Sequence, residues 1–203
     1  MKVVRIVVLA VVLVLFGTWV YAADCASGGR YEINGYPTPD GTVTDCRTGL
    51  VWLRNAKCVD YLNGVPNPTG RLAWHDAMKW VRGLATDYCG LSDSSHPGDW
   101  RLPTKTEWMA MLQYAKGRYT NPTLTNGVGT GQWTDDDAFS SVQSSLYWSS
   151  TTYIHDETDA YEGNLINGFS NYVGAKTTLR YVWPVRAGQV GGNTTSFDSV
   201  TIE

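Results

Sequence analysis

The sequence predicts an α+β domain in which two helices pack on a twisted antiparallel sheet, with a long irregular loop region before the last strands. Three observations support this class. Short strand-like segments precede residue 54, amphipathic segments lie at 71–85 and 105–115, and strand-like segments return between 146 and 186. With 203 residues and 43% hydrophobic content, the chain is long enough to bury one core, which predicts a single domain.

The first 22 residues have the pattern of a secretory signal peptide. Two basic residues precede an apolar run from Ile6 to Phe16, and Val20-Tyr21-Ala22 places small residues at the two positions that signal peptidase reads. We expect cleavage after Ala22 or Ala23 and no membrane span thereafter; the alternative is an uncleaved anchor helix, for which the apolar stretch is short. The predicted divisions are a signal peptide at 1–22, an N-terminal extension at 23–39, the folded domain at 40–187 and a flexible tail at 188–203.

The expected mature chain is acidic. The sequence has 16 Lys and Arg against 19 Asp and Glu, and the signal holds two of the basic residues, which leaves 14 against 19 and a net charge near −5. A nucleic-acid partner requires a basic face, so this balance argues against nucleic acid. It also weakens a simple electrostatic case for binding sulfated polysaccharides.

All four cysteines follow the signal, and an even number in an exported protein predicts two disulfide bonds. Sequence alone allows three pairings. We favour Cys25–Cys46 and Cys58–Cys89, each closing a moderate loop worth about 3 kcal/mol in the chain-entropy model. Zinc is the alternative, but the Cys-x-x-Cys spacing and nearby histidines of zinc sites are lacking. The expected location is secreted, periplasmic or cell-surface.

The N-terminal part of the predicted domain contains short strands joined by turns. Tyr31-Glu32-Ile33 is the first candidate strand, and Asp40-Gly41 is a turn before the second at Thr42-Val43-Thr44. A third strand is predicted at Gly49–Leu53. Together these segments predict a β-ribbon with Trp52 facing the core.

Two helices are predicted next. Apolar residues recur at helical spacing from about Arg71 to Ala85, with Thr69 as the candidate N-cap. The second helix runs from Lys105 to about Ala115. Thr104, just before this helix, and Glu107, in its first turn, form a Thr-x-x-Glu capping box, which is typically worth ~1 kcal/mol. A proline just before Thr104 makes this stretch a rigid corner between strand and helix.

Residues 117–145 are the least regular part of the chain. They hold several glycines, an aspartate run and a serine cluster. A loop of this length inside a compact domain is more often functional than idle. Strands are predicted after it at Leu146–Thr151, Ala160–Ile166, Phe169–Val173 and Leu179–Arg186, with Asn167-Gly168 as a type I′ hairpin turn.

Five motifs occur in a fixed order along the chain. They are Asp45 with Thr48-Gly49-Leu50-Val51-Trp52; the helix with Trp74, Ala77 and Leu84; Asp99-Trp100-Arg101-Leu102-Pro103-Thr104 with Glu107; Tyr147-Trp148-Ser149-Ser150-Thr151; and Val182-Trp183-Pro184-Val185-Arg186. In this order they resemble the Lcl C-terminal domain family, named for the tail of a bacterial collagen-like adhesin. The resemblance covers roughly residues 40–187.

This resemblance implies a C-type-lectin-like fold in an exported bacterial protein with a role in adhesion or surface binding. The Lcl adhesin domain is associated with glycosaminoglycan binding and with trimer formation. The present chain departs from that adhesin in having no collagen-like Gly-x-y region and in being acidic. An oligomer is therefore an open expectation.

Aromatic side chains and one arginine are the candidate ligand-binding residues, because the C–H faces of sugar rings suit stacking on an aromatic plane. A structural reading competes with this one. In it Arg101 pairs with a carboxylate, Asp45 or Glu107, and the Tyr147 strand packs into the core on both faces. The candidates are Arg101, Trp133, Tyr147, Tyr153, Tyr161 and Tyr172.

Asp135-Asp136-Asp137 is the candidate Ca²⁺ site, since Ca²⁺ takes six to eight oxygen ligands. A solvated acidic loop is the alternative, because the Glu-Pro-Asn and Trp-Asn-Asp motifs of calcium-binding lectins are absent. No other cofactor is expected. The three histidines are scattered, and neither Gly-x-Ser-x-Gly nor His-Glu-x-x-His occurs, so no enzyme activity is predicted.

The sequence therefore predicts an exported, non-catalytic ligand-binding or adhesion domain that recognises an extracellular carbohydrate. The alternative is a structural or protein-interaction module of the bacterial cell envelope without a sugar site. The expected partner is accordingly an extracellular glycan or an envelope protein.

Overall fold

A computed structural model describes residues 25, 28–59, 61–62 and 65–188 of the chain. The predicted signal peptide at 1–22, and all but the first residue of the predicted tail, lie outside the described residues. Within the described part, no helix has the length and apolar character needed to cross a membrane.

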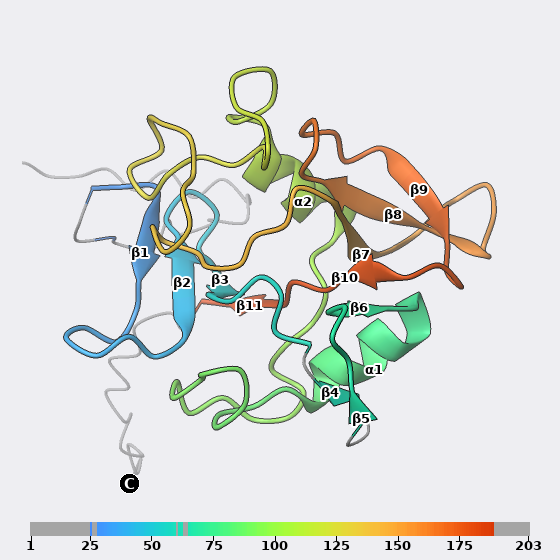
Figure 1. The fold of residues 1–203 in the computed structure, drawn as a ribbon, viewed down its shortest axis with the longest axis horizontal. Coiled ribbons are helices and arrows are strands. Elements are labelled where there is room, and N and C mark those ends of the chain that lie inside the picture. Colours follow the sequence, from blue (N-terminus) through green and yellow to red (C-terminus); the bar gives the residue numbers. More distant parts are fainter. Residues whose placement is uncertain (1–24, 26–27, 60, 63–64, 189–203) are drawn as a thin grey trace, which may run out of the picture.

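The described residues form two helices and eleven short strands (Figure 1). The strands are β1 (Tyr31–Ile33), β2 (Thr42–Asp45), β3 (Leu50–Leu53), β4 (Tyr61–Leu62), β5 (Val65–Pro66), β6 (Arg71–Leu72), β7 (Leu146–Thr152), β8 (Asp159–Asn164), β9 (Tyr172–Ala175), β10 (Arg180–Tyr181) and β11 (Val185–Ala187); the helices are α1 (Trp74–Gly83) and α2 (Lys105–Leu112). This architecture confirms the α+β prediction.

The strands form two sheets and a small ribbon, rather than the single antiparallel sheet that was predicted. The first sheet has the order β1-β2-β3-β11, the second has the order β6-β10-β7-β8-β9, and β4 pairs with β5. All strand pairs are antiparallel except β10 with β7, which is parallel. The long segment 113–145 contains no helix or named strand, as expected.

The predicted last strand, Leu179–Arg186, is divided between the two sheets. Its first part is β10 and its last part is β11. Between them the fully buried Trp183 donates its indole N–H to the carbonyl of Leu53 at 2.7 Å. Pro184 follows and has no N–H to continue a ladder. The chain therefore passes from one sheet to the other at the buried Trp183.

The first helix begins later than predicted. Arg71 and Leu72 form β6 and pair with β10, so α1 starts at Trp74. The Thr69 hydroxyl does not cap a helix; it accepts a hydrogen bond from the Arg71 N–H at 3.2 Å. The second helix starts at Lys105 as predicted, but it ends three residues before Ala115.

The connection between β8 and β9 is longer than a two-residue turn. The predicted type I′ turn at Asn167-Gly168 is wrong, because β8 ends at Asn164 and β9 begins at Tyr172. Asn164 organises the connection: its carbonyl accepts the Gly168 N–H at 2.8 Å and its side chain accepts the Ile166 N–H at 2.8 Å. Gly168 has φ 76° and packs against Lys116 and Thr123.

The core lies on both faces of the second sheet because side chains alternate along β7. On the α2 face, Tyr147 packs with a cluster of rings that includes Trp52, Trp108 and Trp183, whose centroids lie 5.3–6.0 Å apart. On the α1 face, Trp148 packs with aliphatic side chains of the helix. Trp52 is fully buried, as predicted.

Both predicted disulfides are present. Cys25 is bonded to Cys46, and Cys58 is bonded to Cys89. The first links the segment before β1 to the turn after β2, and the second links the segment after β3 to the loop that follows α1. The bonds therefore join loops around the first sheet and α1.

Candidate functional site

A surface pocket of about 610 Å³ lies between the loop 92–99 and the end of β11. This volume is in the usual range for small-molecule sites, roughly 300–1,000 Å³. Its lining residues are polar with two exceptions, and they are Asp93, Ser94, Ser95, His96, Asp99, Arg186, Ala187 and Gly188.

The loop 92–99 is held in place by backbone hydrogen bonds to three other segments. The Ser92 N–H donates to the Asp40 carbonyl at 2.9 Å, and the Gly98 N–H donates to the Arg82 carbonyl, near the end of α1, at 2.8 Å. The Ser95 carbonyl accepts the Thr86 N–H at 3.1 Å. The pocket wall is therefore built on a fixed backbone.

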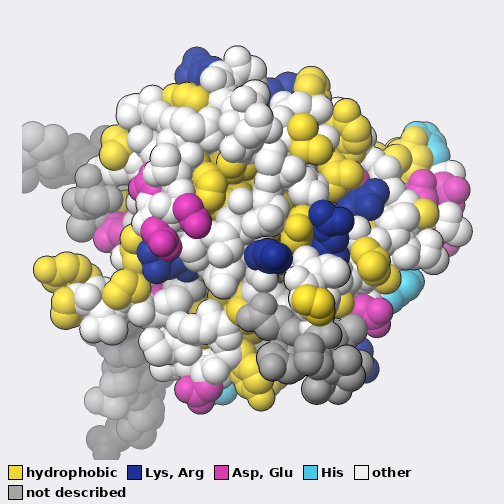
Figure 2. Space-filling model, viewed as in Figure 1, with side chains coloured by type: hydrophobic (Ala, Val, Ile, Leu, Met, Phe, Trp, Pro, Cys, Tyr) yellow, Lys and Arg dark blue, Asp and Glu magenta, His cyan; other side chains and the backbone are white. Residues whose placement is uncertain are grey.

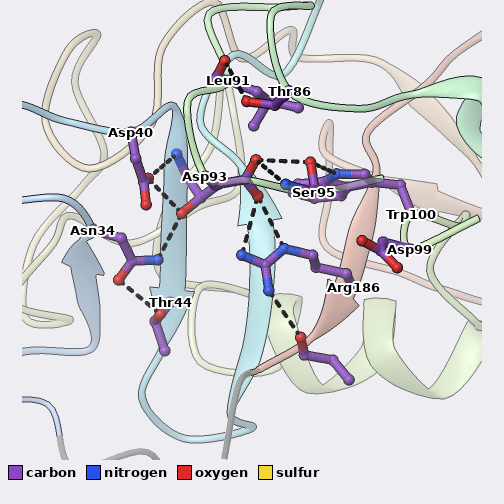
Figure 3. A network of polar contacts seen from close by, with 12 residues as sticks. Asn34, Asp40, Thr44, Thr86, Leu91, Asp93, Ser95, Asp99, Trp100 and Arg186 are labelled. Atoms are coloured by element: carbon purple, nitrogen blue, oxygen red, sulfur yellow. Dashed lines mark hydrogen bonds and ion pairs between the residues drawn. The ribbon is translucent and has the colours of Figure 1, made fainter. Parts of the chain in front are cut away.

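Two of the lining residues, Asp93 and Arg186, form a buried ion pair, which we call the floor of the pocket (Figure 3 shows the pair). Asp93 Oδ2 lies 3.2 Å from Arg186 Nε and 3.1 Å from Nη2. The two side chains are only 1% and 10% exposed. Asp93 Oδ1 accepts the Ser95 N–H at 3.2 Å and its hydroxyl at 2.7 Å. The Ser95 hydroxyl in turn accepts the indole N–H of the buried Trp100 at 3.0 Å. This network holds the floor to the core.

The rim of the pocket consists of exposed polar side chains. Ser94 and His96 are exposed, and the Asp99 carboxylate accepts the His96 backbone N–H at 2.7 Å. The imidazole Nδ1 lies 3.8 Å from the same carboxylate. In Figure 3 no dashed line joins Asp99 to the other residues drawn. The rim thus presents a hydroxyl, an imidazole and a carboxylate, a set suited to hydrogen-bonding a polar ligand.

Two predicted ligand residues, Trp133 and Tyr147, are core residues. Trp133 is buried and donates its indole N–H to the Phe139 carbonyl at 3.1 Å. Tyr147 is fully buried, and its hydroxyl accepts the Gln143 N–H at 2.9 Å. Burial raises the pKa of Tyr147 above its ordinary value. Neither ring has a face available for stacking on a ligand, because the core covers both.

Arg101 is held by a carboxylate of its own chain. Its Nη1 and Nη2 bond the two oxygens of Glu107 at 2.7 and 2.6 Å. The hydrogen bond to Glu107 raises the pKa of Arg101 above its ordinary value, although burial opposes this rise. Of the two carboxylates that the structural reading proposed, Glu107 is the partner. Asp45 instead lies 3.6 Å from the buried Arg30.

The remaining three tyrosines are not brought into one site. Tyr153 and Tyr161 meet edge to face with centroids 5.4 Å apart, and the ammonium of Lys105 lies 3.9 Å from the Tyr161 centroid. Tyr172 pairs with Glu162 across β8 and β9, so it points to the opposite face of the sheet from Tyr161. None of the three lines the pocket.

The three carboxylates proposed for Ca²⁺ are directed at different partners. Asp135 accepts the Ser141 N–H at 2.7 Å, Asp137 accepts the Gly127 N–H at 2.9 Å, and Asp136 lies 3.9 Å from Arg54. Among the described residues, the one grouping compact enough for a metal combines Glu32 with Cys25 and Cys46. Those sulfurs are bonded to each other and are not thiolate ligands.

A family model, the Lcl C-terminal domain, matches residues 41–186, which include all the pocket residues except Ala187 and Gly188. The chain belongs to the Lcl C-terminal domain family. Membership indicates an adhesin-type domain of the cell surface, and the two disulfides agree with an extracellular or envelope location. No curated protein and no solved structure gives a significant match.

The pocket residues of this Lcl C-terminal domain were not singled out from the sequence. Asp93, Ser94 and His96 lie between the two predicted helices, in a segment rich in Ser, Asp, Gly and Pro. One signal was available: Arg186 ends the mainly apolar strand that the sequence predicts at Leu179–Arg186, and a buried guanidinium needs a carboxylate partner. The sequence does not say which aspartate supplies it, because the two residues are 93 positions apart.

Proposed function

We propose that this Lcl C-terminal domain is a non-catalytic, C-type-lectin-like adhesion module that binds an extracellular carbohydrate in the pocket between the loop 92–99 and β11. The observation that carries the proposal is a concave site with a rigid floor and an open polar rim. Sugar hydroxyls both donate and accept hydrogen bonds. The Ser94 hydroxyl, the His96 imidazole and the Asp99 carboxylate supply complementary groups.

A non-catalytic role agrees with the hydrogen bonds of the pocket. The Ser95 hydroxyl donates to Asp93 and accepts from Trp100. In the described part of the chain, no hydrogen bond joins a pocket serine to His96, whose side chain is 82% exposed. A serine nucleophile is ordinarily activated by an adjacent base. The pocket is better suited to binding than to acyl transfer.

Calcium has no role in the proposal. The acidic run 135–137 uses its carboxylates within its own loop and with Arg54. We therefore expect ligand binding to be the same in the presence of Ca²⁺ and of a chelator.

A glycan array probed with the disulfide-intact protein tests the proposal. Ala187→Tyr places a large side chain in the pocket, and Ala175→Tyr makes the same change at an exposed position on β9, away from it. We expect specific glycans to bind the wild type and Ala175→Tyr but not Ala187→Tyr, with or without chelator. Binding to no glycan, or equal binding by Ala187→Tyr, would contradict the proposal.

A protein-interaction module of the cell envelope is the second candidate, and exposed apolar side chains favour it. Ile166, Phe169, Tyr172 and Val173 are 36–48% exposed, and hydrophobic side chains gather over the β8–β9 connection in Figure 2. Under this alternative, Phe169→Ser would abolish binding to a purified envelope fraction and Ala187→Tyr would leave it unchanged. The reverse result would favour the carbohydrate site.

A further inference from the structure

We infer that the pocket prefers sugars that carry a free amine over sugars that carry sulfate or carboxylate groups. The inference rests on the proposed carbohydrate site and concerns the charge of its ligand. It follows from how the three charged side chains of the pocket are used: Asp93, Asp99 and Arg186.

The guanidinium of Arg186 is not available to an anionic ligand. Nε and Nη2 are bonded to Asp93, and Nη1 donates to the carbonyl of Ala187 at 3.3 Å. The side chain is 10% exposed. An arginine that recognises sulfate or carboxylate normally presents its free fork to the ligand. Here the internal carboxylate of Asp93 occupies that fork.

The Asp99 carboxylate, in contrast, is open to the ligand. Its side chain is 49% exposed, and its contacts in the described structure are the backbone N–H and imidazole of His96. A carboxylate has about four lone-pair sites, so acceptor capacity remains. It is placed to accept hydrogen bonds from an ammonium group on a bound sugar.

The net charge of the pocket is negative, which also disfavours an anionic ligand. Two carboxylates and one guanidinium line it, which gives a net charge of −1 when histidine is neutral. No lysine lines the pocket in the described part of the chain. An anionic sugar would therefore meet net repulsion, whereas an amino sugar would meet the exposed carboxylate of Asp99, which retains acceptor capacity.

The expected preference for the amino sugar is modest because the rim of the pocket is exposed to solvent. An exposed ion pair changes an equilibrium constant by about 1.5- to 5-fold at ordinary salt. Ionic strength screens such a pair, so the preference should shrink between low salt and high salt. The hydrogen bonds to the sugar hydroxyls should persist.

Calorimetric titration with three oligosaccharides of equal length tests the inference. The ligands are a glucosamine oligomer, its fully N-acetylated form and a sulfated heparin fragment. For the wild type we expect the amine to bind about 1.5- to 5-fold more tightly than the N-acetylated form, with the heparin fragment weakest. Asp99→Asn should weaken binding of the amine more than binding of the N-acetylated form, so that the two ligands bind with nearly equal affinity. An asparagine side-chain oxygen can still accept the His96 N–H, so the fold should be retained.

Equal binding of amine and N-acetyl oligomers by the wild type would overturn the inference. The inference would also be overturned if the heparin fragment bound more tightly than both other oligomers and lost this binding in Ala187→Tyr. Either result would leave carbohydrate binding itself intact. If no glycan binds, in this series or on the array, the proposed function fails and the inference fails with it.

Discussion

Arg101 and Glu107 form a bidentate ion pair, with N–O distances of 2.7 and 2.6 Å, at the first turn of α2. The same carboxylate accepts the Thr104 N–H at 2.7 Å and completes the capping box. The Arg101 backbone also exchanges two hydrogen bonds of 2.9 Å with Val185 on β11. This residue therefore couples α2 to the strand that carries Arg186, so the corner supports the pocket.

Glu107→Ala should lower the free energy of unfolding by about 1–3 kcal/mol. It removes the reciprocal half of the capping box, typically worth ~1 kcal/mol, and an ion pair that is partly screened because Arg101 is 43% exposed. Urea denaturation at pH 7 measures the change. Thr104→Ser keeps the cap hydroxyl and should stay close to wild type. An alanine variant as stable as the serine variant would refute this role of the corner.

The same pair predicts an acid-sensitive part of the stability. Burial raises the pKa of Glu107, but the hydrogen bonds from Arg101 and Thr104 outweigh it, so the folded-state pKa lies below its ordinary value. The stabilisation is therefore complete above the unfolded pKa, about 4.3, and is lost as the pH falls through the folded value. Between pH 7 and pH 3, the urea midpoint of Glu107→Gln should fall less than that of the wild type. Equal losses would contradict the assignment.

The carboxyl of Glu162 is expected to affect the pH dependence of stability in the opposite direction from that of Glu107. Burial raises the pKa of its carboxyl, and Arg180, whose Nε lies 2.8 Å away, opposes the rise only in part. A raised folded-state pKa means that this contribution to stability is present below the unfolded pKa and is lost as the pH rises through the folded value.

Arg180→Met should consequently destabilise the domain by about 2–4 kcal/mol at pH 7, because it leaves a buried carboxylate unpaired. Part of the loss should be recovered at pH 5, where the carboxyl is more readily protonated. The double variant Arg180→Met/Glu162→Gln removes the charge and should be more stable at pH 7 than Arg180→Met alone. Denaturation curves that rank the two variants in the opposite order would exclude the buried-charge explanation.

Gly163 on β8 faces the ring of Trp108, and a Cβ at this position would overlap the ring. Gly163→Ala should therefore cost about 1–3 kcal/mol through overpacking. Gly83, the last residue of α1, is the matched control because nothing lies within 4 Å of a Cβ built there. Gly83→Ala should be neutral or stabilising by up to ~1 kcal/mol. Thermal denaturation of both variants checks the packing, and a tolerated Gly163→Ala would show that α2 sits farther from β8.

Features that depend on neighbouring residues could be predicted from the sequence. The capping box at Thr104 and Glu107 is such a feature, because its hydrogen bonds connect residues three positions apart. The alternation of side chains along a strand places Tyr147 and Trp148 on opposite faces, and burial of both supports the structural reading of this strand over a ligand role for Tyr147. The favoured pairing of the four cysteines, one of three that the sequence allows, is also confirmed.

Features that depend on distant residues could not be predicted. The segment from Arg71 continues the helical pattern of α1, but pairing with β10, more than 100 positions later, makes its first two residues a strand. The exposure of an aromatic residue is likewise a tertiary property, so Trp133 was a candidate ligand residue although the core covers it. The pocket floor joins residues 93 positions apart, and no local pattern marks it.

Backbone amide chemical-shift mapping tests the central claim most directly. The glucosamine oligomer would be titrated into the isotope-labelled, disulfide-intact protein. The pocket assignment predicts saturable shifts in residues 93–96, 99 and 186–188, which line the site, and their loss in Ala187→Tyr. Saturable shifts confined to the β8–β9 connection or to the C-terminal end of α2, with none in the pocket, would contradict it.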